Sequence, residues 1–129
     1  MEQYRNDIVE LAGAVFAAAP RRRVLKAGEF MFEGDAQRVV AEEAQLDTPE
    51  GRIRVALSKP AERPPFEWQW EITSDIGEAD FFKHYLVRDE DVVLAQKKVL
   101  TPIDDYHARI VLSDLRAALK HVPQPSEPV

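Results

Sequence analysis

The two ends of the chain carry apolar residues at helical spacing. Over residues 2–19, apolar side chains recur every three or four positions and therefore lie on one face of a helix. Pro20 ends this helix, because proline disfavours helical geometry at the residue before it. A second helix is predicted to start at Thr101 as the N-cap, with Pro102 at its first position and Asp104 at its third. Its apolar stripe consists of Val111, Leu112, Leu115, Ala118, Leu119 and Val122.

Between these helices the pattern changes to an alternation of apolar and polar residues, which predicts strands. Residues 28–33 and 52–57 follow this pattern, and residues 92–100 are predicted to return as an antiparallel strand after the turn at 89–91. Residues 81–88 are apolar on both faces, which is typical of a central strand. The clearest strand is marked by four large apolar side chains on one side, namely Phe66, Trp68, Trp70 and Ile72.

Residues 37–46 admit two interpretations. The stretch 41–44 (Ala-Glu-Glu-Ala) has helical propensity and favours a short helix. The following residues 48–51 have proline second and glycine fourth, which is typical of a tight turn into the strand at 52–57. We therefore predict a strand at 37–46 that pairs with this strand as a hairpin, and a short helix is the alternative.

Together the elements predict an α+β fold: a single antiparallel sheet of five to six strands in a meander, flanked by an N-terminal and a C-terminal helix. A chain of 129 residues fits one domain, and we assign residues 1–122 to it. The remaining residues, 123–129, include Pro123, Pro125 and Pro128. We expect them to form a disordered, proline-rich tail.

Composition and charge narrow the possible environments and partners. The chain has no cysteine, which excludes disulfides and thiolate chemistry and fits a reducing compartment, so we expect a cytoplasmic protein. A net charge of −6 disfavours nucleic acid and anionic membranes as partners. The uncharged run 11–19 is too short to span a membrane, and its acidic flank is unlike a signal peptide. In this acidic chain, Arg21, Arg22 and Arg23 are interpreted as a solvated linker rather than an anion clamp.

No sequence motif indicates catalysis. The chain contains no G-x-S-x-G, no H-E-x-x-H and no glycine-rich phosphate loop. Asp104 and His107 share a helix face and could ligate a metal, but Asp104 is already accounted for by its position at the helix start. We therefore predict no catalytic residue, no cofactor and no metal site.

Four residues are candidates for ligand binding: Trp68, Trp70, His84 and Tyr85. The stripe of Phe66, Trp68, Trp70 and Ile72 is interpreted first as core under a helix. It could instead form a cavity floor or an interface, because both helices are rich in alanine and leave space above two indoles. In that cavity His84 would supply the polar group among apolar walls.

Two functions are compatible with these observations. The first is a small acidic protein-interaction module, adaptor-like or chaperone-like and not catalytic, whose partner is another protein or a second copy of the chain. In element order, size and acidity the chain resembles the type III secretion chaperones, a resemblance of fold that no residue motif carries. The alternative is a small-molecule-binding domain or enzyme with a cavity between strand 66–72 and a helix.

Overall fold

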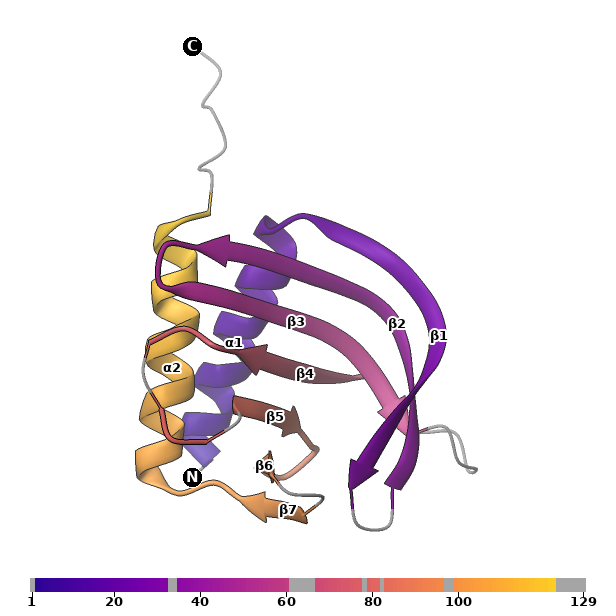
Figure 1. The fold of residues 1–129 in the computed structure, drawn as a ribbon. Helices are drawn as coiled ribbons and strands as arrows, with labels where there is room; N and C mark the ends of the chain where they lie inside the picture. Colours follow the sequence, from indigo (N-terminus) through magenta and orange to yellow (C-terminus); the bar gives the residue numbers. More distant parts are fainter. Residues whose placement is uncertain are drawn as a thin grey trace.

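The protein is an α+β domain with one helix at each end and a single sheet between them (Figure 1). The computed structural model describes residues 2–32, 35–60, 67–77, 79–81, 83–96 and 99–122. The elements in chain order are α1 (Glu2–Ala18), β1 (Arg21–Phe32), β2 (Asp35–Thr48), β3 (Gly51–Pro60), β4 (Gln69–Ser74), β5 (Lys83–Val87), β6 (Val92–Gln96), β7 (Val99–Pro102) and α2 (Asp105–Lys120).

In the described residues, every strand pairs antiparallel with the next one in sequence, which gives a meander of seven strands in the order β1 to β7. The predicted fold class is confirmed. The seventh strand arises because the stretch 92–100, expected to be one strand, contributes to two: β6 ends at Gln96 and β7 begins at Val99. The predicted tail at 123–129 and the side chains of Phe66 and Phe82 lie outside the described residues.

Residues 37–46 form a strand, as predicted, within β2. This strand pairs with β1 on one side and with β3 on the other, and the turn to β3 lies between the paired residues Thr48 and Gly51. Pairing on both sides satisfies the backbone groups of β2, which outweighs the helical propensity of residues 41–44. Gly51 has a φ of 141°, a backbone conformation that side-chain-bearing residues rarely adopt.

Two local predictions are wrong. Arg21, Arg22 and Arg23 do not form a linker but begin β1, where register places Arg22 opposite Glu43 and Arg23 opposite Glu42. Pairing with β2 satisfies the backbone hydrogen-bonding groups that a linker would leave to solvent.

The second correction concerns the start of α2. Asp104, not Thr101, is the N-cap, and its carboxylate accepts a hydrogen bond from the backbone N–H of His107 at 3.0 Å. Thr101 and Pro102 belong to β7, where they pair with Leu94 and Val93. The cap therefore shifts by three residues, because the preceding segment gains ladder hydrogen bonds as an edge strand.

Both helices pack on the same face of the sheet and lie side by side (Figure 1). The core between these layers is fully or almost fully buried, and its largest fully buried members are Ile8, Val15, Ile53, Val55, Ile72, Tyr85, Val111 and Leu115. Small residues of α1, including the buried Ala12, let this helix approach its neighbours closely. In the described part of the chain, neither helix is long and apolar enough to span a membrane.

Candidate functional site

The pleat of the sheet separates the four residues that the sequence proposed as a ligand site. In the β4–β5 ladder, Ile72 pairs with Tyr85 and Thr73 pairs with His84. Directly paired residues project to the same face and successive residues to opposite faces. Tyr85 therefore lies on the helix-covered face, and His84 lies on the other. The structure does not bring His84 into a common site with Trp70.

The two tryptophans also have different environments. The ring of Trp70 packs against Phe16 of α1 at a centroid distance of 5.0 Å, and an added Cβ at Gly13 would lie 3.7 Å from its indole. Trp68 precedes β4 and is 44% exposed, with the ammonium of Lys59 4.9 Å from its ring centroid. Trp70 is thus part of the packing under α1, whereas Trp68 is a surface residue.

His84 belongs to a polar network on the face of the sheet that the helices leave uncovered. Its Nε2 lies 2.7 Å from Oε1 of Glu71, a side chain with no exposed surface. Arg54 joins the network, with Nη1 at 3.6 Å from Oε2 of Glu71 and Nε donating to Oε2 of Glu43 at 2.5 Å. The four residues come from β2, β3, β4 and β5 in turn. They therefore connect four neighbouring strands through charge-assisted contacts.

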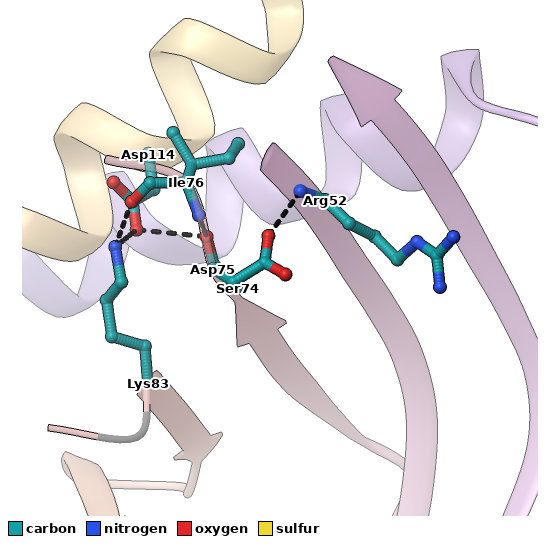
Figure 2. A network of polar contacts seen from close by, with 6 residues as sticks. All are labelled: Arg52, Ser74, Asp75, Ile76, Lys83 and Asp114. Carbon is teal, nitrogen blue, oxygen red and sulfur yellow. Dashed lines mark hydrogen bonds and ion pairs between the residues drawn. The ribbon is translucent and has the colours of Figure 1, made fainter. Parts of the chain in front are cut away.

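A second polar network lies on the helix-covered face, where it joins the sheet to α2 (Figure 2). The ammonium of Lys83 donates to Oδ2 of Asp114 at 2.8 Å, and the hydroxyl of Ser74 donates to the same oxygen at 3.0 Å. Lys83 also donates to the backbone carbonyl of Ile76. The hydroxyl of Ser74 in turn accepts from the N–H of Ile76 at 3.1 Å. The side chains of Ser74, Lys83 and Asp114 are all buried, so the ion pair lies in the interior. Most of its hydrogen-bonding groups have partners within the network.

Residues that follow β4 hold this network in register with the β2–β3 hairpin. The carboxylate of Asp75 accepts from the N–H of Arg52 at 2.5 Å, and the N–H of Asp75 donates to the carbonyl of Arg52 at 3.0 Å (Figure 2). The approach is so close that a Cβ at Gly51 would lie 2.7 Å from Asp75 atoms. The segment carrying Ile76 is therefore tied to β3 on one side and to Lys83 on the other.

Burial dominates the electrostatics of this site. Desolvation raises the pKa of Asp114 above its ordinary value, although the hydrogen bonds and charge of Lys83 and Ser74 act in the opposite direction. Nearby, Tyr85 is only 1% exposed, and its hydroxyl has no hydrogen-bond partner among the described residues. Burial, and then the negative charge of Asp114, raises the pKa of this hydroxyl.

Above the network lies a groove of about 410 Å³, which we call the α2 groove. Its lining residues come from α2, from β5 and from the β4–β5 connection: Ile76, Gly77, Lys83, Tyr106, Arg109, Ile110, Ser113 and Asp114. Tyr106 is 63% exposed, the highest exposure among the large apolar residues of the described chain. Arg109 is exposed too, and no described carboxylate lies within ion-pair distance of it.

The first turn of α2 fixes the backbone that carries Tyr106. The ring of His107 stacks edge-on against Phe81 and against Tyr106, at centroid distances of 5.0 and 5.4 Å. His107 Nδ1 also lies 2.8 Å from Oδ1 of Asp104, and hydrogen bonding from His107 lowers the pKa of that carboxyl. Asp104 and His107 thus form a helix cap, and no group of three metal-binding side chains occurs in the described part of the chain.

Sequence reasoning missed most of the α2 groove, although one signal was present. Asp114 lies within the apolar stripe of α2, and Lys83 shares a strand face with Tyr85 and Val87. Opposite charges on two otherwise apolar faces indicate a buried ion pair when those faces meet.

Comparison of the chain with protein-family models, with curated proteins and with solved structures finds no match.

Proposed function

We propose that this domain is a cytoplasmic, non-catalytic protein-interaction module that binds its partner in the α2 groove. The observation that carries the proposal is Tyr106, a tyrosine 63% exposed at the rim of a groove of about 410 Å³. Tyrosine is among the residue types that dominate binding energy at protein interfaces. The ion pair of Lys83 and Asp114 gives this groove a rigid floor.

The chemistry of the groove favours binding over catalysis. The ammonium of Lys83 is committed to Asp114 and to the carbonyl of Ile76, so it is neither an available base nor a nucleophile. The Asp114 carboxylate accepts from both Lys83 and Ser74. The polar groups nearest to the groove therefore hold the fold together.

The alternative function, a ligand cavity between the aromatic strand and a helix, has less support. Phe16 of α1 packs against Trp70, and a Cβ at Gly13 would be in ordinary van der Waals contact with the indole, so α1 lies directly on this tryptophan. Trp68 is on the surface, and His84 is on the opposite face of the sheet. The four candidate residues thus lack the common cavity that this function requires.

The proposal is tested by selecting peptides that bind the immobilised domain from a phage-displayed library of random dodecapeptides. Enriched peptides are then synthesised with a fluorophore, and their affinities are measured by fluorescence anisotropy. We expect Tyr106→Ala to weaken binding about thirtyfold, the effect of losing a contact worth about 2 kcal/mol. Because Tyr106 is exposed, circular dichroism should show that this variant remains folded.

Trp68→Ala is the matched control, because it removes another exposed aromatic side chain that does not line the α2 groove. It should change the affinity by less than about twofold. If no peptide is enriched, or if the enriched peptides bind Tyr106→Ala as well as they bind the wild type, the proposed function is wrong.

A further inference from the structure

We infer that the α2 groove recognises an extended peptide segment in which an apolar side chain neighbours a glutamate or aspartate, whose carboxylate pairs with Arg109. This inference rests on the proposed function and names the chemistry of the partner. It follows from the charges along the groove, from its dimensions and from its apolar walls.

Among the described residues that line the groove, the positive and negative charges do not balance. Lys83 and Asp114 neutralise each other at the floor, 2.8 Å apart. Arg109 remains as a cation at the rim, with no carboxylate of the described chain within ion-pair distance. Asp105, one helical turn before Arg109, is a nearby acid on α2, and the structure does not pair the two. A ligand that adds one carboxylate at this point therefore complements the groove.

The groove has the length of a short extended segment. Tyr106, Arg109, Ile110 and Ser113 line it from α2, and the seven residue steps from the first to the last cover about 10 Å along a helix. A strand rises about 3.3 Å per residue, so about three peptide residues fit this distance. Tyr106 and Ile110 provide apolar contacts for one of them.

The position of Arg109 favours an acidic side chain over a free chain terminus. Arg109 lies between Tyr106 and Ser113 along α2, near the middle of the groove and not at one end. A passing segment can place a side-chain carboxylate there. A terminal carboxylate would need its donors where the peptide stops. We therefore assign the contact to an internal glutamate or aspartate.

Charge reversal with a matched control tests this assignment. The probe is a fluorescent dodecapeptide selected on the wild type, compared with the same peptide carrying Gln for Glu or Asn for Asp. Arg109→Glu should weaken the acidic peptide at least about fivefold, as expected for an exposed charge contact of about 1 kcal/mol. Arg116→Glu makes the same change on an exposed arginine of α2 outside the groove, and should alter affinity less than about twofold.

The peptide variants complete the experiment. The amide peptide should bind the wild type more weakly than the acid does, and a peptide with lysine in that position should regain affinity for Arg109→Glu. Amidating the peptide C-terminus should have no effect, and a loss on amidation would overturn the assignment to a side chain.

Failure of this inference is distinguishable from failure of the proposed function. If binding of the selected peptides depends on Tyr106 while the peptides carry no acidic residue, the pairing of a peptide carboxylate with Arg109 is wrong, and the groove remains the binding site. The same conclusion follows if both arginine variants weaken binding equally. If binding is independent of Tyr106, the groove itself is wrong. If the wild type sediments as a dimer and Arg109→Glu sediments as a monomer, the inference is overturned, because the groove then binds a second copy of the chain and not a peptide.

Discussion

The buried ion pair between Lys83 and Asp114 offers the sharpest test of how α2 is attached to the sheet. Lys83→Met keeps an unbranched apolar stem of similar length and removes the ammonium. Asp114 then remains buried with the hydroxyl of Ser74 as its remaining donor among the contacts shown in Figure 2. The substitution also leaves the carbonyl of Ile76 without the hydrogen bond from Lys83.

The expected loss follows from these contacts. A hydrogen bond to a charged group contributes about 1.5–3 kcal/mol, and Lys83 makes two hydrogen bonds. Removing one partner of a buried pair costs about 3–5 kcal/mol, because the other charge stays buried without compensation. A domain of this size is stable by about 5–15 kcal/mol, so Lys83→Met should remove a large fraction of the free energy of unfolding.

Urea unfolding followed by tryptophan fluorescence measures this loss. With a slope of about 1–3 kcal/mol per molar urea, the unfolding midpoint should fall by about 2 M. The double variant Lys83→Met/Asp114→Leu replaces the pair with apolar side chains. It should recover most of the stability, because no uncompensated charge is left inside. Each single variant alone should be the less stable protein.

Two results would refute this reasoning. If Lys83→Met costs less than about 1 kcal/mol, the ammonium behaves as a surface charge and the interior pair is not formed. If the losses of the two single variants simply add in the double variant, Lys83 and Asp114 are not coupled, and the attachment of α2 has another origin.

Two further predictions concern packing and pH. Trp70→Ala should lower the free energy of unfolding by about 3 kcal/mol because it opens a cavity against Phe16. Trp68→Ala should lower it by less than about 1 kcal/mol because that indole is 44% exposed. Equal losses in urea melts followed by circular dichroism would contradict the placement of Trp70 in the packing under α1 and of Trp68 on the surface. The pKa of Asp114 is raised in the folded state, so the folded protein binds the proton first as pH falls. The contribution of Asp114 to the free energy of unfolding should therefore increase as pH falls through the raised folded pKa toward the ordinary value of 3.8, and should decrease as pH rises. Unfolding of the wild type and of Asp114→Asn over a pH series should show that the free energy of unfolding of the wild type rises relative to that of the variant at lower pH. A difference between the two proteins that does not vary with pH would contradict this prediction.

The sequence predicted the fold class because the determining signals are local. The apolar stripes of α1 and α2 repeat with helical spacing, and the turn at residues 48–51 directs β2 back onto β3. The start of α2 was misplaced because Thr101 and Asp104 both suit an N-cap, and the pairing of Thr101 with Leu94 decides between them. That pairing is a contact between strands, which local capping rules do not include.

The candidate site was far less predictable, since it depends on which faces meet. Trp68, Trp70, His84 and Tyr85 were grouped by their chemistry, as aromatic walls with one polar imidazole. Ladder register places His84 opposite Thr73 and Tyr85 opposite Ile72, on different faces. A shift of one residue in that register would exchange the two faces. Alternation within β5 alone puts the adjacent residues His84 and Tyr85 on opposite faces, and the register against β4 then decides which of the two shares a face with Trp70.

What the sequence by itself determined was the set of elements and their order, because helical and strand periodicities are properties of neighbouring residues. Only the tertiary structure decided that Lys83 and Asp114, which are 31 residues apart, form one buried pair. Only it decided that Tyr106 and Arg109 stand beside a groove above that pair. The physical reason is that burial turns isolated charges into an obligatory pair, and burial arises when the helix is packed on the sheet.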